Sequence, residues 1–199
     1  KICLDLGFFG ICIEWDLIRL PTLHRLEILG DSLLVVQWVR GVWKATFYDY
    51  KSIVQKIQRH GEKLMLQRGV LPRMKHVDFH RHVYRERNRQ ADALATAALE
   101  GSATCTWKGG AWPFLRGWFD GGHRRDNASS AWILEGAVDP QADWQTVGQG
   151  AIVGKGSSTR AELLALTLLH CALAHLLGMQ IPCPEVWYIQ LQQHPDIFL

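Results

Sequence analysis

The sequence has no apolar run of the roughly 18 to 20 residues that a membrane-spanning helix requires. Its longest apolar stretch, residues 163–177, is interrupted by one threonine and two histidines. The apolar opening, residues 1–15, is interrupted by Asp5 and Glu14, and no small-residue cleavage pattern follows it. We therefore expect no membrane span, no signal peptide and no membrane partner.

Cysteine pairs are also missing. The five cysteines are widely spaced and none forms a Cys-x-x-Cys motif, which argues against a zinc ribbon or a disulfide framework. An odd, unpaired set of thiols indicates an intracellular, reducing compartment, with cytoplasm and nucleus both open. The chain does not begin with Met, which is typical of a fragment of a longer protein.

A large excess of charge of one sign is also missing. The net charge of +3 is too small to indicate a nucleic-acid binder, although basic residues cluster at 80–89 and 123–125. Such clusters are more often a solvated face than a phosphate track. The apolar share of 48% and charged share of 21% are typical of a globular rather than a disordered chain.

Periodicity divides the chain into two structured segments. In residues 25–99 it predicts strands at 25–29 and 76–83 and helices at 31–39, 48–66 and 88–99. In residues 115–178 it predicts strands at 115–119, 130–134 and 144–153 and a buried helix at 159–177. Residues 100–114, which contain a Gly-Gly pair, Ser and Thr residues and a Trp-Pro pair, are expected to be a flexible linker, and residues 1–24 and 179–199 are unassigned tails. The pattern indicates an α/β fold with a mixed sheet.

Four acidic residues lie at the ends of these elements, and each has an ordinary structural explanation. Asp31 is a possible helix cap, and Asp92 a first-turn acid favoured by the helix dipole. Asp120 fits a turn before two glycines, and Glu162 fits a capping box with Thr159 as N-cap. Taken singly, most of these acids are best explained without a functional role.

The motifs around the acids resemble ribonuclease H. Trp-Phe-Asp-Gly-Gly at 118–122, followed by Ser-Thr-Arg-Ala-Glu at 158–162, resembles the first half of that family. Leu-Glu-Ile-Leu-Gly-Asp-Ser at 26–32 and the segment 82–95, which contains an aspartate ten residues after its first residue, a histidine, resemble the second half. The halves occur in the reverse of the family order.

The resemblance implies a circularly permuted ribonuclease H-like fold. It would have three layers, with a mixed five-stranded sheet and helices on both faces. Residues 25–99 would form the second half of the domain, residues 115–178 the first half, and residues 100–114 the connection. We expect a monomer whose acids lie within ~8 Å of one another, with exchange of halves between two chains as an alternative.

The same resemblance implies an endonuclease that cleaves the RNA strand of RNA/DNA hybrids with two Mg²⁺ or Mn²⁺ ions. The implied metal ligands are Asp120, Glu162, Asp31 and Asp92, with His82 as a mobile catalytic histidine. The implied substrate contacts are Gly121, Ser32, Trp43 and Asn88. Three alternatives remain open: a catalytically silent binding module, a fragment that spans two half-domains, and an integrase- or transposase-like enzyme.

Overall fold

The computed structural model describes residues 23–66, 79–101, 105–108 and 110–178. Nearly all of the two tails assigned from sequence, and the first part of the strand expected at 76–83, lie outside these ranges. Within them the chain forms six strands and four α-helices. None of the helices there combines the length and apolar character needed to cross a bilayer.

The elements occur close to where periodicity predicts them. The strands are β1 Arg25–Gly30, β2 His80–His82, β3 Cys105–Trp107, β4 Phe114–Arg124, β5 Asn127–Ala137 and β6 Gln145–Lys155. The helices are α1 Leu33–Val39, α2 Tyr48–Leu66, α3 Arg89–Leu99 and α4 Ser158–Leu176, with a short 3-10 turn η2 Arg85–Arg87 before α3.

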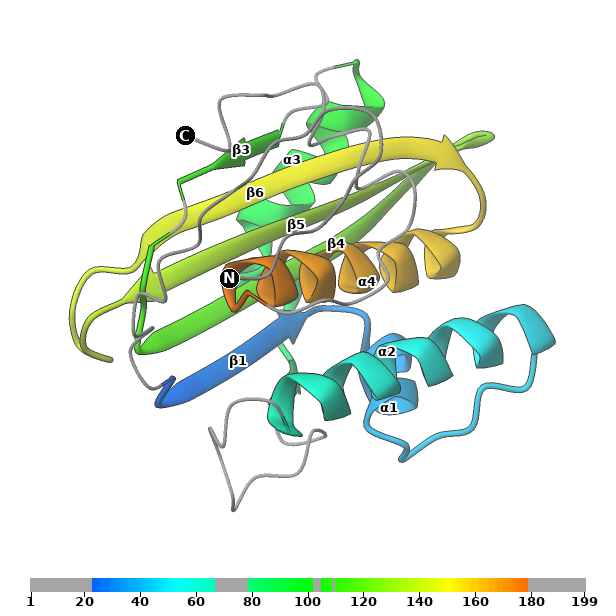
Figure 1. Ribbon diagram of the computed structural model, residues 1–199. Coiled ribbons are helices and arrows are strands. Elements are labelled where there is room, and N and C mark those ends of the chain that lie inside the picture. The colour runs from blue at the N-terminus through cyan, green and yellow to red at the C-terminus, as the bar shows by residue number, and fades with distance from the viewer. Residues whose placement is uncertain (1–22, 67–78, 102–104, 109, 179–199) are drawn as a thin grey trace, which may run out of the picture.

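All six strands form one mixed sheet in the order β2-β1-β4-β5-β6-β3 (Figure 1). β1 is parallel to both of its neighbours, whereas β4, β5 and β6 form an antiparallel meander. The parallel pair joins the two sequence segments, because Arg25–Gly30 lies in register with residues 114–119 along its whole length. Residues 25–30 and 114–119 are thus hydrogen-bonded neighbours in one sheet.

The expected count of five strands is wrong, because the segment taken as a linker contributes a sixth. β3 pairs antiparallel with β6 at the sheet edge. Its Cys105 is buried, and the Trp107 ring packs edge-on against Trp132. Apolar side chains therefore anchor this part of 100–114, whose Gly and Ser content had suggested a flexible connection.

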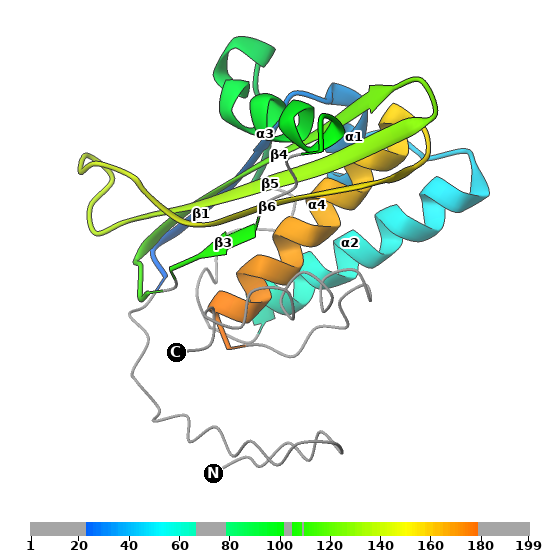
Figure 2. The same ribbon diagram turned by 90° about the horizontal axis from the view of Figure 1, so that it is seen from above.

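Helices cover both faces of the sheet (Figure 2). α4 packs against β4 and β5 on one face, with α2 beyond it, and α3 packs on the opposite face. The larger core lies between the sheet and α4 and contains Phe119, Trp132 and Leu163. The smaller one consists of alanines of α3, β5 and β6, whose short side chains let α3 lie close to the strands.

Helix α4 is buried around most of its circumference, as its continuous apolar sequence predicts. Its N-cap is Ser157, whose hydroxyl accepts a hydrogen bond from the backbone N–H of Arg160 at 3.2 Å. The expectation of a Thr159 cap is therefore wrong by two residues. Glu162 consequently lies two residues further into the helix than the third helical position that a capping box requires, and its side chain is available for another role.

Candidate metal centre

Three carboxylates meet where the parallel strand β1 ends beside β4. One oxygen each of Asp31, Asp120 and Glu162 lies within 4.8 Å of the other two. Gly30, the last residue of β1, pairs with Phe119, so the residues that follow on the two strands, Asp31 and Asp120, are brought side by side. Each acid comes from a different element, and two of the three are nearly fully buried.

Asn88 connects the two aspartates. Its side-chain nitrogen Nδ2 donates to Oδ1 of Asp31 and to Oδ1 of Asp120, both at 3.2 Å, and to the carbonyl oxygen of Phe119 at 3.0 Å. Only 1% of Asn88 is exposed. A buried donor shared by two neighbouring carboxylates fixes their spacing and offsets part of their repulsion.

Glu162 reaches the cluster because α4 comes unusually close to β4 at Gly121. A Cβ atom on Gly121 would lie 2.3 Å from the backbone nitrogen of Glu162, so only glycine fits there. On the neighbouring strand, the hydroxyl of Ser130 donates to the carbonyl of Ala161 at 2.8 Å and holds the same turn of α4 against the sheet. The position of Glu162 is therefore built into the packing of the fold.

The two buried acids, Asp120 and Glu162, have strongly raised pKa values. Burial, the charge of Asp31 and a hydrogen bond to Asp31 raise the pKa of Asp120 from 3.8 to about 8. Burial, followed by the charges of Asp120 and Asp31, raises the pKa of Glu162 from 4.5 to about 9. A backbone N–H of Gly121 and the charge of Arg85 act in the opposite direction on Glu162. Deprotonating the whole cluster is thus costly unless a cation compensates the charge.

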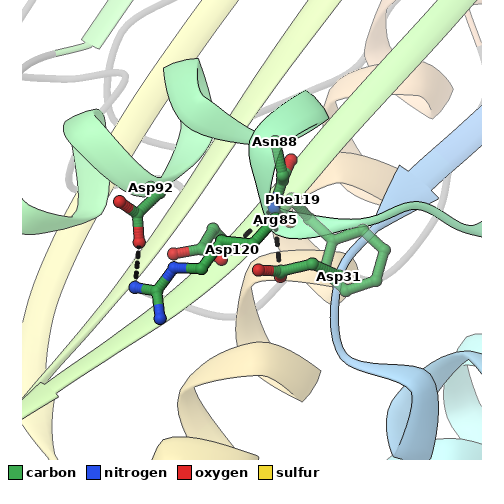
Figure 3. A network of polar contacts seen from close by, with 6 residues as sticks. All are labelled: Asp31, Arg85, Asn88, Asp92, Phe119 and Asp120. Carbon is green, nitrogen blue, oxygen red and sulfur yellow. Dashed lines mark hydrogen bonds and ion pairs between the residues drawn. The ribbon is translucent and has the colours of Figure 1, made fainter.

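Asp92, the fourth expected acid, is not part of the three-carboxylate cluster. Its Oδ1 accepts a hydrogen bond from Nη2 of Arg85 at 2.6 Å, as Figure 3 shows. The charge of Asp92 still contributes to the raised pKa of Asp120, so it lies within electrostatic reach of the cluster. Its carboxylate is about one-third exposed.

The three-carboxylate cluster fits a divalent cation. Hard carboxylate oxygens are the ligands that Mg²⁺ and Mn²⁺ prefer in proteins. Oε2 of Glu162 is buried and has no hydrogen-bond partner among the residues that the structure describes. A buried oxygen without a donor is costly, and coordination of a cation would remove that cost.

Among the other residues expected at the site, His82, Ser32 and Asn88 adjoin the cluster, whereas no contact joins Trp43 to it among the residues that the structure describes. The Nε2–H of His82 donates to the backbone carbonyl of Asp31 at 3.1 Å, so the ring adjoins the cluster without touching a carboxylate. Ser32 begins α1 directly after Asp31, and Trp43 is exposed in the loop between α1 and α2. Asn88, expected to contact substrate, instead has its amide nitrogen turned towards the two aspartates.

Arg85 and Ser130 belong to this site but were missed in the sequence. Arg85 lies within the 82–95 motif, seven residues before Asp92, but it belongs to the short 3-10 turn η2 and not to α3, so helical spacing did not predict the contact. Ser130 carries no local signal either, because its role depends on the register of β5 against α4.

Comparisons of the sequence and the structure with known protein families, curated proteins and solved structures found no match.

Proposed function

We propose that this chain is a metal-dependent endonuclease of the ribonuclease H type that cleaves the RNA strand of RNA/DNA hybrids. The observation that carries the proposal is the convergence of Asp31, Asp120 and Glu162 around a buried oxygen that lacks a donor. Asp31 directly follows β1, Asp120 lies within β4, and Glu162 lies in α4, each within one of the motifs that resemble ribonuclease H. Chance placement of all three at one point is improbable for acids that burial penalises so strongly.

The arrangement of the halves supports a circularly permuted domain. β1 of the first segment pairs with β4 of the second, and Asp31 and Asp120 lie on either side of that join. A single chain thus provides acids from both segments to one cluster. We therefore propose a monomer in solution, which light scattering coupled to size-exclusion chromatography would test.

A groove near the N-terminus of α4 has aromatic side chains, one acid (Asp49) and one cation in its lining, and we infer that a polynucleotide strand binds there. It has a volume of about 620 Å³, and Phe47, Tyr48, Tyr50, Ser157 and Arg160 are among the residues that line it. Aromatic rings with a cation are typical of surfaces that bind nucleic-acid strands. The β4–β5 turn adds exposed basic residues 123–125 beyond Asp120 on the same strand.

Each residue of the site would have a distinct role in the reaction. When bound, Mg²⁺ or Mn²⁺ would supply an activated water and stabilise the leaving oxygen of a phosphodiester. Asp31, Asp120 and Glu162 would hold the ions, with Asp92 as the more exposed fourth ligand. Asn88 keeps Asp31 and Asp120 at their spacing, and burial excludes competing water from Asp120 and Glu162.

Selectivity for RNA in a hybrid rests on the resemblance. A site that contacts 2′-hydroxyl groups loses those contacts on duplex DNA. Among the residues implied for such contacts, Ser32 and Gly121 adjoin the cluster directly in sequence.

The test is cleavage of a hybrid by the wild type and two shape-preserving variants. Asp120→Asn and Glu162→Gln should each reduce cleavage by at least ~10³-fold, because each removes a charged ligand. Asp126→Asn, an exposed acid of the β4–β5 turn, is the matched control and should retain activity.

Wild-type rates for Asp120→Asn would show that the acids do not form the active site. Equal loss in all three variants would point to a general charge effect. A catalytically silent wild type that binds the hybrid would favour the binding-module alternative.

A further inference from the structure

Arg85 carries a positive charge beside the acid cluster. Its guanidinium bonds to Asp92 at 2.6 Å, and its charge lowers the raised pKa values of Asp120 and Glu162. In Figure 3 the Arg85 side chain runs alongside Asp120 and ends at Asp92. Its side chain is 74% exposed, so it can turn into solvent without disturbing the core.

We propose that Arg85 acts as a built-in cation that competes with the second of two divalent ions at this site. This inference rests on the proposed function and deepens it. The first ion binds at the three clustered carboxylates, Asp31, Asp120 and Glu162. A second ion would take Asp92, the remaining carboxylate expected as a ligand, and the Asp92 carboxylate is held by Arg85. The occupancy of the second position is therefore set by whether Arg85 stays or withdraws.

Charge balance gives the physical reason. The four carboxylates of Asp31, Asp92, Asp120 and Glu162 carry four negative charges when ionised. One divalent ion and the Arg85 guanidinium together compensate three of these charges. A second divalent ion makes the site net positive unless Arg85 withdraws, so repulsion between like charges weakens its binding. Withdrawal costs one exposed ion pair, which is a weak interaction. The first ion should thus bind tightly, and the second should bind only at higher metal concentration.

The matched control is Arg87, which lies two residues further along the same 3-10 turn. It carries the same charge and is also exposed, and within the described part of the chain it forms no ion pair. Comparison of Arg85→Gln with Arg87→Gln therefore separates the Arg85–Asp92 contact from the loss of any one positive charge nearby.

The experiment is a titration of the full chain with Mn²⁺, in which electron paramagnetic resonance measures the free ion. For Arg85→Gln we expect the second dissociation constant to fall by about tenfold, with a much smaller change in the first. Arg87→Gln should change both constants by less than about twofold. Arg85→Gln should also reach maximal hybrid cleavage at a lower Mn²⁺ concentration than the wild type.

Three results would overturn the inference. One is an unchanged second dissociation constant in Arg85→Gln, and another is an equal shift in both arginine variants. The third is binding of a single ion by both the wild type and Arg85→Gln, which would leave the metal-dependent function standing. Failure of both proteins to bind any Mn²⁺ would instead overturn this inference together with the proposed function.

Discussion

Asp120→Asn should make the metal-free protein more stable at neutral pH. In the folded protein the pKa of Asp120 is raised from 3.8 to about 8. A raised folded-state pKa means that the stability contributed by this group is complete below pH 3.8 and is lost as pH rises towards 8. Each pH unit in that window costs up to about 1.4 kcal/mol of unfolding free energy for one group. Between pH ~4.5 and pH ~7 the loss from Asp120 is thus at most about 3 kcal/mol.

Asparagine keeps the shape of the side chain and cannot ionise. The variant should therefore match the wild type near pH 4 and exceed its unfolding free energy by up to about 3 kcal/mol near pH 7. With divalent metal bound, the wild type should instead be more stable than Asp120→Asn. An ion present at a hundred times its dissociation constant adds about 2.7 kcal/mol to a protein that binds it, and Asp120→Asn should gain far less.

Urea denaturation from pH 4 to pH 8, with Mg²⁺ or with a chelator, measures both effects. Asp126→Asn is again the control, since Asp126 is exposed at the β4–β5 turn. The reasoning fails if Asp120→Asn loses stability at pH 7 without metal. It also fails if Mg²⁺ stabilises the variant as much as the wild type, because Asp120 would then not be a ligand.

Three further predictions follow from the same contacts. Gly121→Ala should destabilise the protein by about 2–5 kcal/mol, because the new Cβ would lie 2.3 Å from the backbone nitrogen of Glu162. Gly154→Ala is the control: a Cβ there would have no atom within 4 Å, so this variant should be nearly neutral in the same urea denaturation. Asn88→Ala should cost about 1–3 kcal/mol by removing the donor shared by Asp31 and Asp120. Asn127→Ala, at the exposed first residue of β5, is its control, and equal effects would refute the bridging role. Mn²⁺ affinity should rise with pH up to about 9, because Asp120 and Glu162 must lose protons from groups whose pKa values are raised to about 8 and about 9. Calorimetry in buffers of different ionisation enthalpy should detect protons released at pH 7, and a release of none would contradict the assignment.

Much of the fold could be predicted from local sequence because its elements are strongly periodic. The apolar spacing in α2 and the short apolar runs at the centres of β4 and β5 indicate the type of these elements. Element ends were less accurate. β4 and β5 extend several residues beyond their apolar centres, because they pair with each other as far as Arg124 and Asn127, and cross-strand pairing leaves no local signature.

The acids of the site could be identified from sequence because each lies within a distinct motif. The residues that contact these acids could not be identified in this way. The Gly121 contact with Glu162 and the bridge from Asn88 join residues more than 30 positions apart. Such contacts depend on strand register and helix packing, which no window of sequence contains. The hydrogen bond from Arg85 to Asp92 likewise depends on the turn η2, a short 3-10 segment without a periodic sequence pattern.

Cleavage assays with three labelled substrates test the central claim most directly. The same RNA is presented as an RNA/DNA hybrid and as a single strand, next to a DNA duplex of the same sequence, each with Mg²⁺, Mn²⁺ or chelator. The account predicts internal cleavage of the RNA in the hybrid with either metal, no cleavage with chelator, and an inert DNA duplex. Cleavage that persists in chelator, or equal cleavage of duplex DNA, would contradict it, as would an intact hybrid in both metals.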